Sequence, residues 1–331
     1  MAKRDKLTKN QQRQVAKQQT QRLTEKTIQL DELSESKEGL LISRYGEQAD
    51  VLDPENKQTF RCYLRQNLGA PVPGDNVSFR IDKQNQGIIE AIFERTSLLE
   101  RPTRHQGVKP IVANIDHIYI VIAPLPDFSS ILLDRYLIAV HNSGIDCTIV
   151  ANKWDLTNEI ESQEIDAFLK VYQNLGYPIL KTSTKQETGI DQLASLAKNQ
   201  RAILVGQSGV GKSSLINQLF PEQQRAVQVV SENSRLGQHT TTSSQLFMFE
   251  DSKGFIVDSP GVRDFNISHL EPQSIIEGYI EFQPYLGLCK FRNCQHINEP
   301  ACEILKAVES QNIERLRWQN YCKIMTDLSQ I

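Results

Sequence analysis

Short apolar runs separated by polar residues recur through the first third of the chain, a pattern typical of β-strands. Clusters of turn-forming residues, such as the proline- and glycine-containing stretch at residues 71–75, separate these runs. Five strands are therefore predicted within residues 37–98, at positions 39–42, 49–52, 59–64, 76–81 and 87–92. So many short strands in so few residues favour a small OB-type barrel, a common nucleic-acid binder, over the alternative of an SH3-like barrel.

From residue 115 onward, apolar strands alternate with amphipathic helices, which is typical of a parallel sheet covered by helices. Residues 99–114, between the two patterns, are expected to be a linker. Two late strands, at 245–249 and 254–257, are expected to pair as a hairpin. The remaining strands are predicted at 118–123, 147–151, 177–180 and 201–205, and the helices at 131–141, 160–175, 190–198 and 214–220.

A final amphipathic segment predicts one helix over residues 303–328, folded against the region before it. Its basic residues include Arg315, Arg317 and Lys323. A solvated charged face is the simpler expectation for these side chains, and contact with RNA is the alternative.

The chain has 331 residues and a formal net charge of −3, so its overall charge selects no class of partner. The charge is uneven, because residues 1–30 hold eight Lys and Arg but two acidic residues. Residues 1–36 have few large apolar side chains, which predicts a disordered basic tail, either solvated or attracted to nucleic acid. No apolar run is long enough to span a bilayer, and the basic N-terminus lacks the apolar segment of a secretory signal. We therefore expect a cytoplasmic protein with no membrane partner.

Eight consecutive residues fit the phosphate-loop pattern G-x-x-x-x-G-K-[ST] at every fixed position: Gly206, Gln207, Ser208, Gly209, Val210, Gly211, Lys212 and Ser213. A predicted strand ends before this loop and a predicted helix follows it, which is the context that phosphate binding requires. The glycines let backbone N–H groups and the helix N-terminus face phosphate oxygens, and Ser214 is expected among the contacts. Lys212 is expected to reach the outer phosphates and act in catalysis, and the Ser213 hydroxyl to hold Mg²⁺.

A second loop, Asn152-Lys153-Trp154-Asp155, follows a predicted strand and fits the guanine-reading pattern N-K-x-D. The Asp155 carboxylate can accept hydrogen bonds from N1–H and N2–H₂ of guanine, a donor pair that adenine lacks. Asn152 is expected to hold the loop in shape, and the stem of Lys153 to lie along the base. Ser183, after the next strand, is expected to support the same base with its main chain. An adenine-specific NTPase remains the alternative.

Two further segments are candidates for sensing the γ-phosphate. Asp258-Ser259-Pro260-Gly261 fits D-x-x-G, in which Asp258 holds Mg²⁺ through water and the Gly261 N–H contacts the phosphate. One threonine of His239-Thr240-Thr241-Thr242 is expected to contact both Mg²⁺ and the phosphate. We favour Thr241, while its two neighbours remain open.

Three cysteines and a histidine are candidates for a metal site: Cys289, Cys294, His296 and Cys302. Clustered cysteines in a cytosolic protein favour metal binding over disulfides. Three thiolates and one imidazole suit a tetrahedral, structural Zn²⁺ site without an open position for water. Because the C-x-H step is short for a zinc finger, a set of reduced, buried cysteines remains the alternative.

The order of these motifs is unusual, because N-K-x-D precedes the phosphate loop instead of following D-x-x-G. A circular permutation would still bring every loop to one edge of the sheet. With the barrel at its start and the cysteine cluster near its end, the chain resembles the ribosome small subunit-dependent GTPase A (RsgA) family of circularly permuted GTPases. The resemblance extends from residue 37 to about residue 325.

After the basic tail at 1–36, which lies outside the resemblance, we expect three domains. These are an all-β OB-fold RNA-binding domain at 37–98, an α/β circularly permuted phosphate-loop GTPase domain at 99–266, and a small, mostly α zinc-binding domain at 267–331. The resemblance implies hydrolysis of GTP to GDP and phosphate by a protein that acts on the small ribosomal subunit and its rRNA in late assembly, and is stimulated by that subunit. We expect a monomer. The alternative is an RNA-binding module whose nucleotide site is structural and does not hydrolyse GTP.

The resemblance also bears on catalysis and on the metal. Val262 follows Gly261, where many GTPases place a glutamine that orients water, and an aliphatic side chain cannot do this. The resemblance implies that His239 takes this role, since a neutral imidazole can accept a hydrogen bond from water. The family has the same cysteine and histidine spacing, which favours zinc. Because the chain runs from Asp258 directly toward the zinc domain, a γ-phosphate-dependent shift near Gly261 is expected to move that domain.

Overall fold

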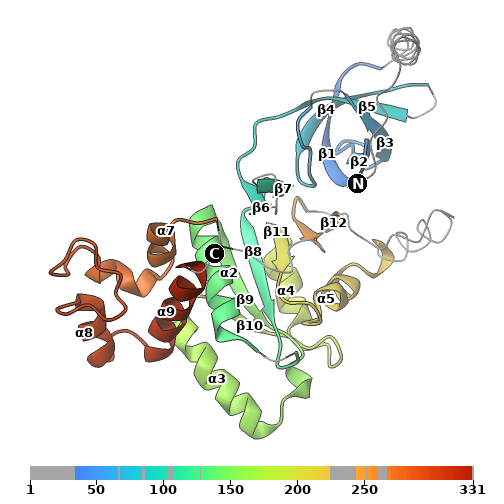
Figure 1. Ribbon diagram of the computed structural model, residues 1–331. Coiled ribbons are helices and arrows are strands. Elements are labelled where there is room, and N and C mark those ends of the chain that lie inside the picture. Colours follow the sequence, from blue (N-terminus) through green and yellow to red (C-terminus); the bar gives the residue numbers. More distant parts are fainter. Residues whose placement is uncertain are drawn as a thin grey trace, which may run out of the picture.

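The computed structural model describes residues 34–65, 68–83, 86–102, 108–126, 128–223, 244–250, 252–259, 267 and 269–329 (Figure 1). Along the chain these residues form a barrel, a helix-covered sheet and a helical C-terminal module (Figure 1). Within these ranges, no helix combines the length and the apolar character that crossing a lipid bilayer requires.

The barrel consists of five strands, as the alternating pattern predicted. The strands are β1 (Lys37–Tyr45), β2 (Gln48–Leu52), β3 (Thr59–Leu64), β4 (Asn76–Ile81) and β5 (Gln86–Ile92). They pair in the order β1-β2-β3-β5-β4, and β4 pairs back to β1, so the barrel is closed and OB-like. Val51, Phe79 and Ile89 are fully buried in its core, because alternate side chains of a strand point to the same face.

The expected linker at residues 99–114 is wrong. Strand β6 (Leu98–Pro102) pairs antiparallel with β7 (Val108–Ala113) to form a two-stranded sheet. Leu99 lies opposite Val112, and both are buried in the core of the neighbouring sheet. The turn-forming residues that suggested a linker occupy only the end of one strand and the connection at 103–107, which lies outside the described residues.

The middle part contributes six strands to an 11-stranded sheet. These six pair in the order β10-β9-β8-β11-β13-β12, and β12 also pairs antiparallel with β1 of the barrel, with Ser43 opposite Gln245. Among the six, all pairs are parallel except β12 with β13, which form the expected hairpin. Their bounds are β8 (His117–Ile122), β9 (Asp146–Ala151), β10 (Ile179–Lys181), β11 (Arg201–Val205), β12 (Gln245–Met248) and β13 (Phe255–Asp258). The carboxyl ends of the five parallel strands therefore lie at one edge, where the candidate loops begin.

Two helices cover each face of this sheet. Helices α2 (Ser130–Ser143) and α3 (Glu159–Asn174) pack in one core cluster, and α4 (Ile190–Ala197) and α5 (Lys212–Leu219) pack in another. Strand β8 contributes alternate residues to the two clusters, with Ile120 in one and Val121 in the other. This double burial explains the nearly continuous apolar sequence of the parallel strands.

The C-terminal module is mostly helical, as predicted, but its last segment is not one helix. The elements are α7 (Pro272–Glu277), the 3₁₀ helix η3 (Ile280–Tyr285), α8 (Glu303–Glu309) and α9 (Arg315–Ser329). The expected helix over 303–328 is interrupted because Gln311 has a left-handed backbone, with φ of 61°. The chain then turns so that Ile313 is buried in the module's core. The polar run Ser310-Gln311-Asn312 was the turn signal that the apolar pattern obscured.

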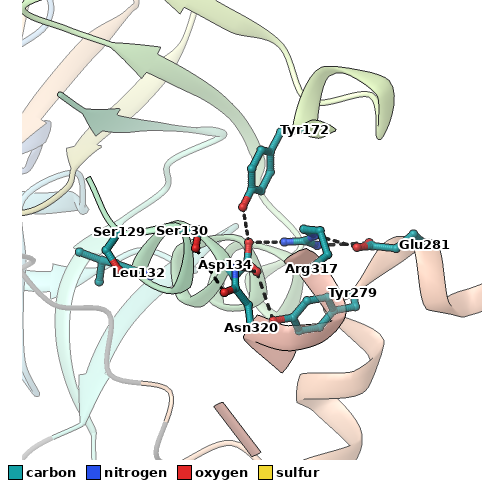
Figure 2. Close-up of polar contacts among 9 residues, drawn as sticks. All are labelled: Ser129, Ser130, Leu132, Asp134, Tyr172, Tyr279, Glu281, Arg317 and Asn320. Carbon is teal, nitrogen blue, oxygen red and sulfur yellow. Dashed lines mark hydrogen bonds and ion pairs between the residues drawn. The ribbon is translucent and has the colours of Figure 1, made fainter. Parts of the chain in front are cut away.

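Arg317 joins this module to the sheet, and neither expected role, a solvated face or RNA contact, is correct for it. Its side chain is 1% exposed and forms ion pairs with Asp134 of α2 and Glu281 of η3 (Figure 2). Asp134 also accepts hydrogen bonds from Tyr172 of α3 over 2.7 Å and from Asn320 of α9 over 2.8 Å (Figure 2). Burial raises the pKa of the Asp134 carboxyl, and the Arg317 guanidinium opposes that shift. We call these five side chains the Asp134–Arg317 network.

Candidate functional site

The phosphate loop joins β11 to α5 and has a backbone that only glycine fits at two of its positions. Gly211 has φ of 97°, and a Cβ there would lie 2.3 Å from Asn152 Nδ2. A Cβ on Gly206 would lie 2.2 Å from the carbonyl oxygen of Val121. The Lys212 ammonium donates to the carbonyl oxygens of Gly206, over 2.6 Å, and Gln207, over 2.8 Å. This lysine is therefore held over the loop in which a phosphate group would be bound.

The exposed residues of this loop present hydroxyl and backbone groups at the N-terminus of α5. Ser208, Gly209, Ser213 and Ser214 are all exposed, whereas Val210 is buried beneath them. Helix N-termini and glycine-rich turns attract anions through their free N–H groups. The arrangement is suited to a polyphosphate.

Asn152 connects the N-K-x-D loop directly to the phosphate loop. It is fully buried, and its Nδ2 donates to the carbonyl oxygen of Val210 over 2.9 Å. Its Oδ1 accepts from the Thr182 hydroxyl over 3.0 Å. Lys153, with a left-handed φ of 59°, donates to the carbonyl oxygen of Leu125 over 3.2 Å. Two loops more than fifty residues apart in the chain are therefore in hydrogen-bond contact.

Asp155 is oriented by the next loop along the sheet edge. The buried Ser183 hydroxyl donates to Asp155 Oδ1 over 2.5 Å and accepts from the Gln186 N–H over 3.1 Å. Trp154 is partly buried beside it, and the Lys181 ammonium lies 4.1 Å from the centre of the Trp154 ring. The carboxylate is thus fixed at the same edge as the phosphate loop.

Asp258 is the last residue of β13, where it lies opposite Leu204 of β11, two residues before the phosphate loop. Ser259, which follows it, is buried, and its hydroxyl is 2.7 Å from that of Ser244. His239, Thr241 and Gly261 lie outside the described residues, so their predicted roles remain predictions.

The metal-site candidates converge in the C-terminal module. The ligand atoms of Cys289, Cys294, His296 and Cys302 all lie within 4.8 Å of one another. Cys289 Sγ is 3.8 Å from Cys302 Sγ, and His296 Nδ1 is 3.5 and 3.4 Å from these two sulfurs. Tetrahedral coordination with ordinary Zn–S and Zn–N bonds requires separations of about 3.8 and about 3.5 Å, respectively. The donor set therefore has the dimensions of a metal site.

The surroundings of the four candidate ligands also suit a metal ion. Burial lowers the pKa of His296, which favours the neutral imidazole that binds metals. The Glu303 N–H points at Cys289 Sγ over 3.4 Å, and such N–H groups stabilise a thiolate. All six cysteines are free, so no disulfide competes for these sulfurs.

Sequence reasoning missed several groups that shape the nucleotide site. Thr182 holds Asn152 in place, the carbonyl oxygen of Leu125 accepts from Lys153, and that of Val121 lies against Gly206. These contacts involve ordinary residues at strand ends or main-chain atoms, which carry no motif. Only the pairing of the strands identifies them.

Comparisons with known proteins agree on one family. The family model for the RsgA GTPase matches residues 92–268. The small ribosomal subunit biogenesis GTPase RsgA of Photorhabdus laumondii is 44% identical, with 98% of this chain and 96% of that protein covered. The protein named small ribosomal subunit biogenesis GTPase RsgA 1 in Vibrio vulnificus is also 44% identical and covers 100% of this chain, with 96% of its own length covered.

Solved structures show the same architecture. The crystal structure of YjeQ from Thermotoga maritima superposes with a TM-score of 0.71 at 32% identity, with 88% of this chain and 98% of that chain covered. The crystal structure of YloQ, described as a circularly permuted GTPase, gives a TM-score of 0.68 at 27% identity, with 89% and 96% covered.

Proposed function

The chain belongs to the RsgA family of circularly permuted GTPases and is a GTP hydrolase, and we propose that it acts on the small ribosomal subunit during its late assembly. The subunit and its rRNA are proposed to raise the rate of hydrolysis. The relatives from Photorhabdus laumondii and Vibrio vulnificus are named for biogenesis of that subunit, which supports this partner.

One observation carries the nucleotide assignment: Asn152 Nδ2 donates to the Val210 carbonyl, which links the guanine-reading loop to the phosphate loop. Asp155, oriented by Ser183, then accepts from N1–H and N2–H₂ of guanine while Trp154 and Lys153 flank the base. The backbone of residues 206–214 surrounds the phosphates. An adenine base offers no matching donor pair to Asp155, which disfavours an adenine-specific enzyme.

For hydrolysis, we assign Lys212 to the outer phosphates, where its charge stabilises the transition state. Ser213 and Thr241 would hold Mg²⁺, which neutralises charge on the phosphate oxygens when it is bound with GTP. Asp258 and Gly261 sense the γ-phosphate region, and His239 orients the attacking water. In the C-terminal module, Cys289, Cys294, His296 and Cys302 would hold one structural Zn²⁺, consistent with the separations of their ligand atoms.

The proposed division of labour follows the order of the chain. A basic tail at 1–36 and the OB-like barrel at 37–98 contact rRNA, the GTPase domain at 99–266 is the switch, and residues 267–331 form a second binding module. A protein with this partner works in the cytoplasm, and we propose that it is a monomer.

Phosphate release from GTP, measured with and without purified small subunits, tests the proposal. We expect subunits to raise the rate by at least tenfold, and Lys212→Ala to abolish turnover in both conditions because the outer phosphates lose their cation. If wild-type protein binds GTP and small subunits yet releases no phosphate, the chain is instead an RNA-binding module with a structural nucleotide.

Asp155→Asn tests base recognition in the same assay. The variant should bind GTP at least tenfold more weakly and xanthosine triphosphate more tightly, because an amide can donate to the O2 of xanthine. Unchanged affinity for GTP would reject guanine reading by Asp155.

A further inference from the structure

The loop between the first two candidate metal ligands is exposed, basic and aromatic. Lys290, Phe291, Arg292 and Asn293 are all exposed, and Phe291 retains 42% of its surface accessible. Leu288, which precedes this loop, is 63% exposed. Large apolar side chains beside exposed cations at a loop tip are more typical of a binding surface than of a solvated turn. We call residues 290–293 the knuckle.

The chain segment that contains the knuckle carries charge of one sign, and the neighbouring Glu303, whose N–H reaches Cys289 Sγ, is paired with Lys306 over 2.6 Å. No acidic residue occurs between Glu281 and Glu299 in the sequence. Both of these carboxylates are engaged elsewhere, because Glu281 pairs with Arg317 and Glu299 accepts from the backbone N–H groups of residues 295, 297 and 298. Within the described ranges, neither Lys290 nor Arg292 forms an ion pair. The exposed Lys290 ammonium lies 5.6 Å from the centre of the Phe291 ring, a contact that leaves its charge unneutralised for an anionic partner.

The knuckle is also held in a fixed conformation. The candidate metal ligands Cys289 and Cys294 flank it on either side. The Lys290 N–H donates to the carbonyl oxygen of Ala301 over 3.4 Å. Behind it, Trp318 Nε1 donates to the His296 carbonyl over 2.9 Å, and the Tyr321 hydroxyl donates to the Gln295 carbonyl over 2.7 Å. A surface that is already ordered loses little conformational entropy when it binds.

We propose that the knuckle binds an unpaired segment of RNA, with Phe291 stacked on a base and with Lys290 and Arg292 on the flanking phosphates. This inference rests on the proposed function only in taking rRNA as the natural source of that segment. An exposed ring between two cations matches a single strand, which offers free base faces and phosphates together, whereas a duplex hides its base faces. An acidic protein surface would use the cations but would leave the ring without a specific role.

The test uses full-length, metal-loaded protein and a labelled single-stranded RNA of mixed sequence, with a duplex of equal length as comparison. Phe291→Ala should weaken single-strand binding about tenfold and leave duplex binding unchanged, while Phe291→Trp should retain binding because it preserves stacking. Lys290→Ala with Arg292→Ala should lower the salt slope for the single strand by about 1.4, as expected for two lost phosphate contacts.

The matched control is Lys170→Ala with Lys253→Ala, which removes two exposed cations from the GTPase domain and should leave single-strand binding as in wild type. Metal content and intrinsic GTP hydrolysis should be unchanged in the Phe291 variants, since no candidate ligand or nucleotide contact is altered.

Wild-type affinity of Phe291→Ala for the single strand would overturn the proposal. If Phe291→Ala kept wild-type affinity for the single strand but bound small subunits more weakly, the knuckle would contact a protein of the subunit instead. Failure of small subunits to stimulate wild-type hydrolysis would count against the proposed function alone, because oligonucleotide binding does not depend on it.

Discussion

The GTPase sheet is joined to its two neighbours by contacts of different kinds. On the barrel side, strand β1 pairs with β12, and the other contacts include neutral hydrogen bonds. The Ala113 N–H donates to the Pro73 carbonyl over 3.0 Å, and Asn114 Nδ2 donates to that of Gly74 over 2.8 Å. On the side of the C-terminal module, Ile138 of α2 packs inside the module's own core, and the Asp134–Arg317 network connects α2 and α3 to η3 and α9.

This difference bears on which module can respond to the nucleotide. A neutral hydrogen bond exchanged for one to water changes stability by about 0.5–1.5 kcal/mol, whereas removing one partner of a buried ion pair costs about 3–5 kcal/mol. The chain enters the C-terminal module directly from the segment after Asp258, which predicted that this module moves with the switch. The Asp134–Arg317 network instead predicts that the module stays with α2, so that any displacement carries both together.

Removal of the proposed Zn²⁺ should have the largest effect, because the four candidate ligands would then lose the ion that ties the 289–302 segment together. Structural Zn²⁺ sites contribute about 10 kcal/mol or more of apparent folding free energy in small peptides. Chelation should therefore unfold the module in a separate, low-temperature transition by circular dichroism. GTP binding should survive in the same sample, and a loss of GTP binding would show that the module and the sheet form one cooperative unit.

Arg317→Met should lower the free energy of unfolding by about 3–5 kcal/mol, because it leaves Asp134 and Glu281 buried without their cation at the contact between the GTPase sheet and the C-terminal module. Thermal or denaturant unfolding measures the change. Arg315→Met is the matched control on the same helix: Arg315 is exposed, and its replacement should change stability by less than about 0.5 kcal/mol. Equal effects of the two substitutions would contradict the structural role of the network.

Asn114→Ala probes the barrel side and should cost about 1–3 kcal/mol, because the Gly74 carbonyl and the Thr96 N–H each lose a partner. The same unfolding experiment applies. Serine or aspartate at this position should recover part of the loss through the Thr96 contact. A larger loss of stability than that caused by Arg317→Met would show that the barrel contact, and not the contact with the C-terminal module, is the stronger of the two.

The smallest expected effect concerns the nucleotide. Spin labels can be placed on exposed residues of α2 and α9, such as His141 and Lys323. Because the Asp134–Arg317 network connects these helices, the distance between the labels should be the same with GDP and with a non-hydrolysable GTP analogue. A nucleotide-dependent change in that distance would instead support the prediction, made from the order of the motifs, that the C-terminal module moves with the switch.

Much of the fold follows from local patterns in the sequence. Alternating apolar residues located the barrel strands, continuous apolar runs located the buried parallel strands, and the glycine-rich loop lay where strand β11 meets helix α5. The convergence of Asn152 with the phosphate loop was also predictable, because the carboxyl ends of parallel strands share one edge of a sheet. The four candidate metal ligands come together largely because they occupy only fourteen residues of the chain.

Tertiary structure decided the features that depend on partners distant in sequence. Strands β6 and β7 exist because Leu99 and Val112 complete a core built by other strands, although their sequence reads as a linker. Arg317 reads as a surface residue, yet it is buried because Asp134, 183 positions away, and Glu281 neutralise it. Periodicity and motifs report what a residue does with its chain neighbours, whereas the burial of a charge depends on a counter-charge that only the folded chain supplies.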